Sequence, residues 1–246
     1  MSNIEATILK RSRHTSRLFL RTLPMKSVHY RMIYLFGPDG TGKTTHAELT
    51  SQYLRSRGYK TWRASVKQHH TLSYLLLKLL SNRKHAGQAI NYYGFNDGLK
   101  HKIKTPWKLL EILSLLPAIL YRVFLPLLLG YIVVCDRYVL DTLATLSYFL
   151  DDQELISGIS AKLLASMIPR DSVLFYMNAD TEVILQRKKD EPLTSKLIDY
   201  YKGAYDALIK QLNLKPITIN TETARIKDIQ KIILQWITKG ACQANT

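Results

Sequence analysis

The stretch "IYLFGPDGTGKTT", residues 33–45, is the most informative part of this 246-residue sequence. The apolar run 32–36 ends at a glycine, a pattern that predicts a short buried strand. The loop after it fits GxxxxGK followed by Ser or Thr without a mismatch, and the next residues predict a helix. A strand, a glycine-rich loop and a helix in this order are typical of a phosphate-binding loop. The stretch therefore predicts a site for a nucleoside triphosphate.

Each residue type in this loop has a chemical use. Glycines let the backbone turn and direct its N–H groups at phosphate oxygens. Lys43 is a cation that can reach the β- and γ-phosphates, and the Thr44 hydroxyl is a ligand for the Mg²⁺ ion that bridges them. A chance glycine-rich turn is the alternative, which the strand–loop–helix setting disfavours. The residues expected to bind ATP are Gly37, Pro38, Asp39, Gly40, Thr41, Gly42, Lys43, Thr44 and Thr45.

Apolar runs and helical patterns alternate along the rest of the chain. This alternation indicates an α/β fold with a five-stranded parallel sheet covered by helices on both faces. The predicted strands are 32–36, 61–66, 131–135, 172–178 and 216–220. The predicted helices are 43–57, 70–81, 105–128, 140–150, 153–167, 181–189, 195–211 and 224–238, with a loop-rich insertion at 82–98 and a kink at Pro117 or Pro126.

A second motif, "VVCDRY", follows the strand 131–135 directly. Asp136 then lies at the carboxyl end of a buried strand, where open α/β sheets bind ligands, and it can hold Mg²⁺ through water. Arg137 offers a planar fork for a phosphate group. A surface salt bridge at the strand end is the alternative, and the phosphate-binding loop favours the functional interpretation.

A third motif, "LQRKKDEP" at 185–192, gathers Arg187, Lys188 and Lys189 at the end of a predicted helix. These cations fit a lid that closes over the transferring phosphate and excludes water. A cationic helix terminus that interacts with its own dipole is the alternative interpretation.

The charge of the chain is strongly positive, at a formal +16, which suits anionic partners without choosing among them. Residues 1–30 form a basic arm that fits an RNA- or lipid-binding element, a targeting segment or a solvated terminus. Residues 31–240 form the expected catalytic domain. The two cysteines, Cys135 and Cys242, show no disulfide framework and no metal-ligand spacing, so a reducing cytoplasmic setting is expected.

The most hydrophobic region, 109–135, raises the question of a membrane span. Glu111 and Arg122 interrupt it and two prolines break it, so a buried or dimer-facing helix that leads into a core strand is preferred. Peripheral membrane contact and a homodimer stay open as alternatives.

Together these segments resemble the thymidylate kinase family. The resemblance rests on "LFGPDGTGKTT", "VVCDRYVLDTLA", "YMNADTEVILQRKK", "KGAYDAL" and "PITIN", and it covers about residues 31–237. It implies a P-loop fold in three α/β/α layers, with a helical lid and a helical insertion on the acceptor side. It also implies ATP- and Mg²⁺-dependent phosphorylation of a nucleoside monophosphate, with dTMP as the first expectation.

The resemblance also implies roles for single residues. Asp39 matches the family's acid that faces the acceptor, and Gly40 stands where some members carry a catalytic arginine. The basic group would then come from the lid, with Arg187, Lys188 and Lys189 as its candidates. The implied catalytic residues are Lys43, Asp39, Arg137 and Arg187; the implied acceptor ligands are Asp39, Asp136, Arg137, Tyr138 and Asp97; the implied metal ligands are Thr44 and Asp136.

Departures from the family pattern fall on the acceptor side. No "REPGG"-like stretch follows the second strand, where Arg63 and Lys67 are the candidate substitutes. "NDGLKH", 96–101, keeps Asp97 and His101 of the family's acceptor segment but has Gly98 in place of its arginine. Two other functions therefore stay open. One is a related kinase for a different nucleotide, nucleoside or sugar-linked acceptor. The other is a nucleotide-dependent protein that assembles on a membrane or RNA, although nucleic acid is not an expected partner.

Overall fold

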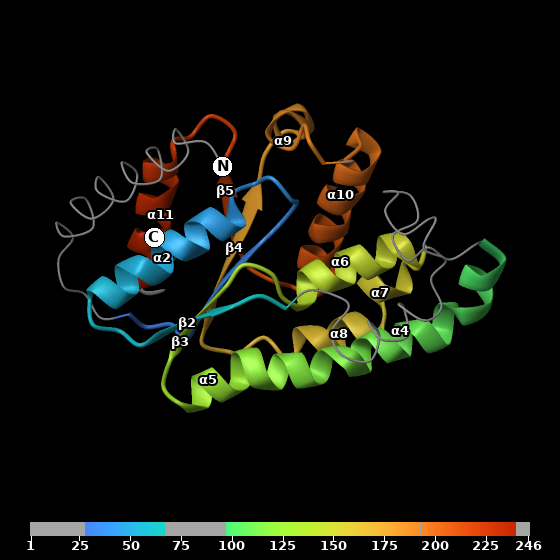
Figure 1. The fold of residues 1–246 in the computed structure, drawn as a ribbon, viewed down its shortest axis with the longest axis horizontal. Helices are drawn as coiled ribbons and strands as arrows, with labels where there is room; N and C mark the ends of the chain where they lie inside the picture. The colour runs from blue at the N-terminus through green and yellow to red at the C-terminus, as the bar shows by residue number, and fades with distance from the viewer. Residues whose placement is uncertain (1–27, 67–96, 192, 240–246) are drawn as a thin grey trace.

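The structure is a computed structural model that describes residues 28–66, 97–191 and 193–239 (Figure 1). Its centre is a five-stranded sheet in the order β2-β3-β1-β4-β5. Every neighbouring pair of strands is parallel, which confirms the predicted sheet. The strands are β1 Met32–Phe36, β2 Thr61–Ala64, β3 Ile132–Cys135, β4 Ser172–Asn178 and β5 Ile217–Asn220.

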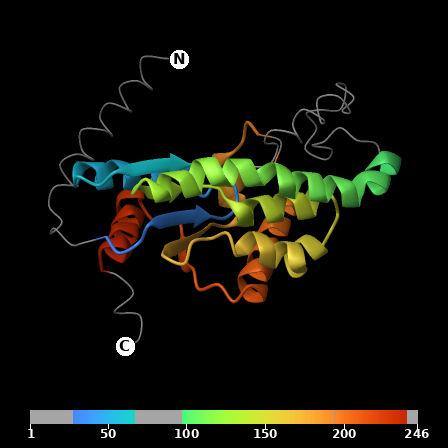
Figure 2. The same ribbon diagram turned by 90° about the horizontal axis from the view of Figure 1, so that it is seen from below.

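Helices cover both faces of this sheet (Figures 1 and 2). The side chains of β1 alternate between two apolar clusters, with Met32, Tyr34 and Phe36 in one and Ile33 and Leu35 in the other. The helices are α2 Lys43–Ser56, α4 Asp97–Ile119, α5 Leu125–Leu128, α6 Val139–Phe149, α7 Glu154–Ser157, α8 Ile159–Ala165, α9 Thr181–Arg187, α10 Ser195–Gln211 and α11 Ile226–Lys239. The first cluster includes residues of α4, α6, α8 and α10, and the second includes residues of α2 and α11.

The register of the sheet determines where a site can form. Met32 of β1 pairs with Val133 of β3 and with Ser172 of β4, so the three strands run side by side in the same direction. Their carboxyl ends meet at one edge, where the glycine-rich loop leaves β1 and the segment from Asp136 leaves β3. This is the edge at which parallel α/β sheets bind their ligands.

A π-helical turn lies between Pro117 and Pro126, the two prolines at which a kink is predicted. Helix α4 continues through Pro117, and the segment η1, Leu120–Phe124, then has π-helical geometry before α5. The N–H of Leu125 bonds to the carbonyl of Leu120, five residues earlier. Pro126 follows directly and has no N–H to continue an α-helical ladder, which accounts for the widened turn at this place.

The prediction of one helix over 153–167 is wrong, because Gly158 separates α7 from α8. Gly158 has an extended backbone, with φ −88° and ψ −170°. A Cβ atom at this position would lie 2.6 Å from the carbonyl oxygen of Glu154, so glycine permits the close turn.

The predicted start of the long helix at 105 is wrong, because α4 begins eight residues earlier, at Asp97. Other predicted boundaries shift by a few residues. Strand β2 ends at Ala64 instead of 66, and helix α9 ends at Arg187 instead of 189. The described residues between α9 and α10 form turns and a bend, so the expected lid is a short segment, 188–194, between two helices. The predicted helix 70–81, most of the insertion 82–98 and most of the basic arm 1–30 lie outside the described residues.

Among the described residues, one helical run is long and apolar enough to cross a membrane by length and composition. It spans Thr105–Leu128, 24 residues, and 44 % of its most apolar window is buried against the rest of the domain. A single run of this kind is weak evidence for a membrane span, because core helices pass the same test.

Candidate active site

The loop between β1 and α2 has the backbone shape that its glycines predict. Gly37, Gly40 and Gly42 have φ angles of 136°, 87° and 86°, a region that other residues rarely adopt. Gly42 is the N-cap of α2, and its carbonyl accepts the first helical hydrogen bond from the N–H of His46, at 3.0 Å. Thr44 and Thr45 lie exposed in the first turn of this helix. A helix N-terminus with accessible N–H groups suits a phosphate group.

Gly37 is the position in this loop that tolerates a side chain least. A Cβ atom there would lie 2.1 Å from the carbonyl oxygen of Met177 in β4. We expect Gly37→Ala to lower the free energy of unfolding by at least about 3 kcal/mol, because it combines backbone strain with a steric overlap. The matched control is Gly58→Ala, where φ is 86° and no atom lies within 4 Å of the added Cβ. It should cost only the strain, about 1–2 kcal/mol. Urea unfolding of both variants measures the difference, and equal costs would contradict the overlap.

Lys43 begins α2 and is folded back over the loop. Its Nζ donates to the carbonyls of Gly37 at 2.6 Å and Pro38 at 2.7 Å, and it lies 3.4 Å from Oδ1 of Asp39. The residue is only 4 % exposed. Burial lowers the pKa of the Lys43 ammonium, while the nearby carboxylates of Asp39 and Asp141 act in the opposite direction. The ammonium is thus held inside the loop by carbonyls that a phosphate could replace as its partners.

Asp39 and Arg137 join the loop to the segment after β3 by an ion pair. Both side chains are partly exposed. Burial alone would lower the pKa of Arg137, but the carboxylates of Asp39 and Asp141 outweigh it and raise this pKa above its ordinary value. The guanidinium therefore stays charged at the edge of the phosphate-binding loop.

Asp136 is buried beside the Asp39–Arg137 pair, and only one of its two carboxylate oxygens accepts a hydrogen bond within the described residues. Its Oδ2 accepts a bond from Arg63 in β2 at 3.1 Å, and Arg63 also bonds to Glu48 of α2 at 2.9 Å. The buried Oδ1 of Asp136 has no hydrogen-bond partner in the described part of the chain, and neither does Nε of Arg63. Buried polar atoms are normally satisfied, so these atoms point to a partner that binds from outside the protein.

The residues present fit a magnesium ion of the kind that phosphoryl transfer uses. No group of three or more His, Cys, Asp or Glu side chains that could hold a metal occurs among the described residues. Mg²⁺ needs no such cage, since it commonly takes one or two protein oxygens together with water and phosphate oxygens. The free Oδ1 of Asp136 and the exposed hydroxyl of Thr44 are oxygen ligands of this type.

Asp141 lies beneath these groups and was not singled out from the sequence. It is buried in the first turn of α6, where its carboxylate accepts bonds from the hydroxyls of Tyr34 at 2.7 Å and Tyr205 at 2.9 Å. The N–H of Tyr138 donates to it at 3.0 Å. An acid within the apolar run "VLDTLA", three residues after Tyr138, is the capping signal that could have revealed it. Asp141 thus connects β1, α10 and the turn that carries Arg137.

The buried carboxyl of Asp141 should make stability depend on pH. Burial raises its pKa above the ordinary 3.8, although Lys43 and Arg137 oppose the shift. Between the ordinary pKa of 3.8 and the raised native pKa, the native state binds more protons than the unfolded state. The contribution of Asp141 to the free energy of unfolding therefore falls as pH rises from the first of these values to the second. We expect the cost of Asp141→Asn to be larger at about pH 5 than at about pH 8, as measured by urea unfolding. The control is Asp228→Asn at an exposed position, and a cost independent of pH would contradict the prediction.

The structure corrects the expectation that Tyr138 lines the acceptor site. The side chain is fully buried, and its hydroxyl donates to the carbonyl of Met167 at 3.0 Å. Its ring packs edge-on against Tyr34, with ring centroids 5.7 Å apart. Tyr138 therefore caps α6 and fills the core beneath the site, and no surface of it is left for a ligand.

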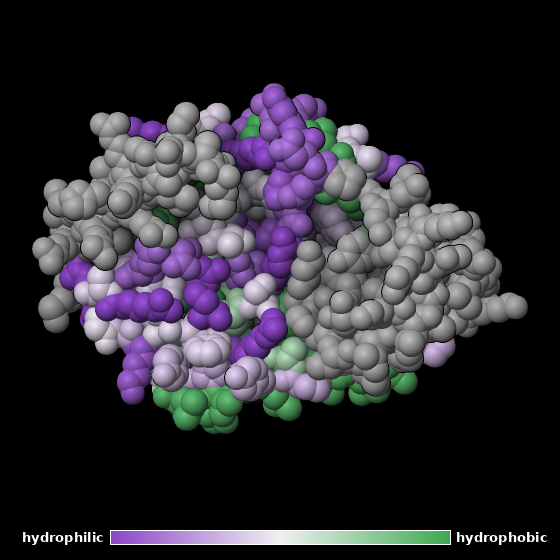
Figure 3. All heavy atoms as spheres, viewed as in Figure 1, coloured by the Kyte–Doolittle hydropathy of each residue, from purple (hydrophilic) through white to green (hydrophobic). Residues whose placement is uncertain are grey.

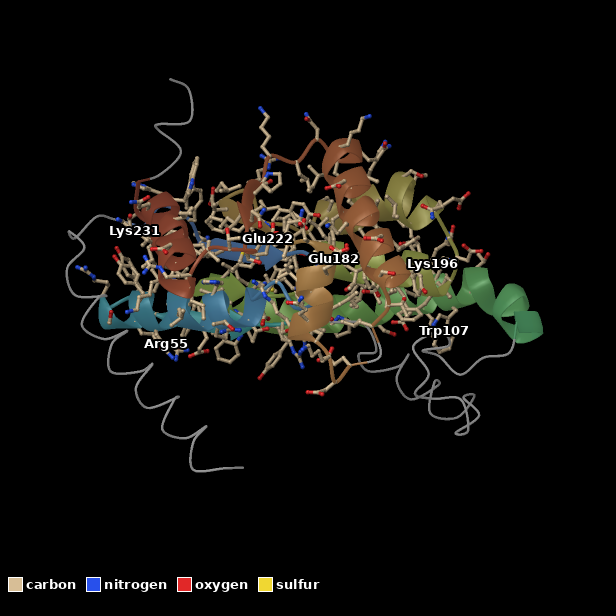
Figure 4. All side chains as sticks on the ribbon, turned by 90° about the horizontal axis from the view of Figure 1, so that it is seen from above. Arg55, Trp107, Glu182, Lys196, Glu222 and Lys231 are labelled. Atoms are coloured by element: carbon tan, nitrogen blue, oxygen red, sulfur yellow. The ribbon has the colours of Figure 1, made fainter. Side chains whose placement is uncertain are left out.

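Arg187 ends α9 and reaches the phosphate-binding loop from the lid side. Its guanidinium donates to the carbonyl of Gly40 at 3.3 Å and to the carbonyl of Thr221 at 2.6 Å. It also donates to the carbonyl of Glu222, which lies after β5 (Figure 4). A side chain at Gly40 would meet Lys188 and Ile184 of the lid side at 3.1 and 3.3 Å. The cation near this part of the loop therefore comes from α9, in agreement with a glycine at position 40.

The structure thus gathers most of the predicted site residues at one edge of the sheet. The loop residues, Asp136, Arg137 and Arg187 come together there, while Tyr138 turns into the core. The side chain of Asp97, at the start of α4, lies outside the described residues, as does Lys67.

A five-stranded parallel sheet with a phosphate-binding loop, and an aspartate–arginine pair beside that loop, define the class of P-loop nucleotide kinases. The structure resembles that of thymidylate kinase from Candida albicans, with a TM-score of 0.54 and 16 % identity over 85 % of this chain and 91 % of that one. This likeness supports the fold. The sequence matches no protein-family model.

Two curated relatives identify the family. Thymidylate kinase of Wolbachia pipientis subsp. Culex pipiens is 30 % identical over 184 residues, which covers 72 % of this chain and 80 % of the relative. A probable thymidylate kinase of Methanococcus aeolicus is 24 % identical over 219 residues, 83 % of this chain and 94 % of the relative. The chain belongs to the thymidylate kinase family. It is an enzyme of the nucleoside-monophosphate kinase class.

Proposed function

We propose that this enzyme transfers the γ-phosphoryl group of ATP, in the presence of Mg²⁺, to the phosphate of a nucleoside monophosphate, with dTMP as the preferred acceptor. The observation that carries the proposal is the ion pair between Asp39 and Arg137. An arginine fork recognises phosphate, and this one contacts the loop that suits the donor phosphates. An acceptor phosphate held by Arg137 would therefore lie beside the γ-phosphate.

On the donor side, the phosphate-binding loop already holds the N–H groups and the ammonium that would bind the phosphates of ATP. The N–H groups at the start of α2 would bind the β- and γ-phosphates of ATP. The ammonium of Lys43 would exchange its carbonyl partners, Gly37 and Pro38, for phosphate oxygens. Thr44 and Asp136 would hold Mg²⁺ directly or through water, and the ion would neutralise charge on the phosphates.

On the acceptor side, the proposed chemistry is mainly alignment. An oxygen of the acceptor phosphate attacks the γ-phosphorus, and the bond from that phosphorus to the bridging oxygen of ADP breaks. Arg137 would hold the acceptor phosphate, while Asp39 orients the guanidinium of Arg137. Arg187 would turn from Thr221 towards the equatorial oxygens as the lid segment closes.

A coupled assay with the full chain, ATP and Mg²⁺ tests the proposal with dTMP, dUMP, UMP, CMP, AMP and unphosphorylated thymidine as acceptors. We expect the highest kcat/KM with dTMP, and no turnover of thymidine, because it offers no phosphate to Arg137. Faster turnover of another monophosphate would reject dTMP as the preferred acceptor but keep the kinase. ATP hydrolysis or binding that no acceptor changes would reject the kinase and favour a nucleotide-dependent assembly protein.

We also propose the cytoplasm as the site of this activity. Cys135 is a free, buried thiol, as a reducing compartment allows. Burial raises the pKa of this thiol well above its ordinary value, so it stays in the unreactive protonated form.

A further inference from the structure

Tyr201 of α10 lies at the edge of a group of tyrosine side chains beneath the proposed site. Two members of this group, Tyr34 and Tyr205, are buried, and their hydroxyls donate to the carboxylate of Asp141 at 2.7 and 2.9 Å. Tyr201 lies one helical turn before Tyr205 on the same face of α10, but it is only partly buried. A molecule bound at the surface can therefore reach Tyr201, whereas the two buried hydroxyls are already used inside the protein.

The packing of α6 against α10 determines where the hydroxyl of Tyr201 lies (Figure 1). Asp141 of α6 meets Tyr205 of α10, and one turn further along α6 the hydroxyl of Thr145 pairs with that of Tyr201. The hydroxyl of Thr145 donates to the carbonyl of Asp141 at 2.7 Å, so its lone pairs are free to accept a bond from Tyr201. The two helices therefore hold both the ring and the hydroxyl of Tyr201.

The charges of the Asp39–Arg137 ion pair act on the hydroxyl of Tyr201. Burial is the largest influence and raises the pKa of this hydroxyl, and the carboxylate of Asp39 raises it as well. The hydroxyl of Thr145 and the guanidinium of Arg137 act in the opposite direction, but the net shift is upward. The hydroxyl of Tyr201 is therefore protonated at neutral pH and is a hydrogen-bond donor beside the ion pair.

The tyrosine that precedes it, Tyr200, faces another part of the molecule. Its hydroxyl donates to the hydroxyl of Ser147 at 3.1 Å and accepts a bond from the side chain of Gln153 at 3.3 Å. Successive residues of an α-helix point about 100° apart, so two neighbouring tyrosines cannot share one direction. Tyr200 thus joins α10 to α6 and to the start of α7, while Tyr201 faces the ion pair.

The surroundings of Tyr201 on the lid side suit a charged ligand. Helix α10 begins at Ser195, directly after the lid segment 188–194, and Tyr201 lies at the end of its second turn. Figure 3 shows mainly hydrophilic side chains over α9, on this side of the molecule. A ligand that enters between the lid segment and the phosphate-binding loop would therefore meet Arg137 and Tyr201 together.

We propose that the hydroxyl of Tyr201 donates a hydrogen bond to the phosphate of the acceptor nucleotide, which Arg137 and Tyr201 then hold together. The inference rests on the proposed function, in which Arg137 is the main ligand of that phosphate. An arginine fork occupies two oxygens of a phosphate group, and a phosphate monoester has a third terminal oxygen for another donor. Rotation of the O–H bond of Tyr201 would redirect its hydrogen from Thr145 to that oxygen.

Tyr201→Phe tests the inference in the full chain, with ATP, Mg²⁺ and the monophosphate that the parent chain phosphorylates fastest. We expect the KM for this acceptor to rise about tenfold, the scale of one hydrogen bond to a charged group, and the KM for ATP to stay within about twofold. The corresponding nucleoside, used as a competitive inhibitor, has no phosphate. Its inhibition constant should therefore be the same in the variant and in the parent chain.

Tyr200→Phe is the matched control, because it makes the same chemical change at the next residue. It loses two hydrogen bonds within the protein, so it should lower the free energy of unfolding in urea at least as much as Tyr201→Phe. Both KM values should nevertheless equal those of the parent chain. A purely structural role of Tyr201 would instead change stability and KM together in the two variants.

The possible outcomes separate this inference from the proposed function. A Tyr201→Phe chain with the parent's KM for the acceptor would overturn the inference, while the activity of the parent chain would keep the proposed function. Weaker inhibition by the nucleoside, to the same extent as the rise in KM, would assign the hydroxyl to the sugar or base and overturn the contact with phosphate. A parent chain that phosphorylates no monophosphate would overturn both.

Discussion

Replacement of Lys43 by methionine is expected to lower kcat/KM for ATP by about a thousandfold, the scale of losing one well-placed charge-stabilising donor. The ammonium is buried in the phosphate-binding loop, where it bonds to the carbonyls of Gly37 and Pro38. Methionine has a similar length and buries no charge. The loss should therefore appear in catalysis and ATP binding more than in the fold.

Steady-state kinetics, fluorescence binding of an ATP analogue and thermal unfolding separate these effects. Lys231→Met is the control, because Lys231 is an exposed lysine on α11 (Figure 4). The control should keep the kinetics of the parent chain. A Lys43→Met variant that stays folded and retains a tenth or more of the parent's activity would place the donor phosphates elsewhere.

The parts of the fold that could be predicted are those with a strong local signal. The strands 32–36 and 172–178 and the helix 195–211 have the bounds predicted for them, because apolar runs closed by turn residues and an amphipathic period leave little choice. The break at Gly158 was missed because the helical period continues across it. Its cause is the approach of Glu154's carbonyl, a contact that the periodicity of the sequence does not contain.

The site shows the same division between local and tertiary information. The phosphate-binding loop and Arg137 follow from motifs, since their residues are neighbours in the sequence. The structural role of Asp141 depends on the fold, because the hydroxyls that donate to it belong to Tyr34 and Tyr205, which lie 107 and 64 residues away in the sequence. Tyr138 was expected at the acceptor for its place in D-R-Y, but α6 begins directly after it and turns its ring inward. Sequence motifs thus indicate which chemistry is present, and packing decides which side chains face the ligand.

Arg137→Gln is expected to lower kcat/KM for the nucleoside monophosphate by about a hundredfold or more, with little change in the KM for ATP. The arginine fork would be the main ligand of the acceptor phosphate, and its loss also removes the closer of the two cations beside the carboxylate of Asp39, leaving Lys43 at 3.4 Å. That carboxylate would then repel the incoming phosphate. The defect should therefore contain two parts, a lost attraction and a new repulsion.

A double-mutant cycle with Asp39→Asn separates the two parts. Asp39→Asn alone should cost less than Arg137→Gln, since it removes an orienting partner and leaves the phosphate ligand in place. The double variant should be no less active than Arg137→Gln, because neutral asparagine no longer repels the phosphate and the two effects are not additive. Arg225→Gln is the control, as it breaks an exposed ion pair with Asp228 in which none of the proposed phosphate ligands takes part. Additive losses would mean that Asp39 contacts the acceptor independently of Arg137, and an unchanged KM and kcat in Arg137→Gln would remove the ion pair from the acceptor site altogether.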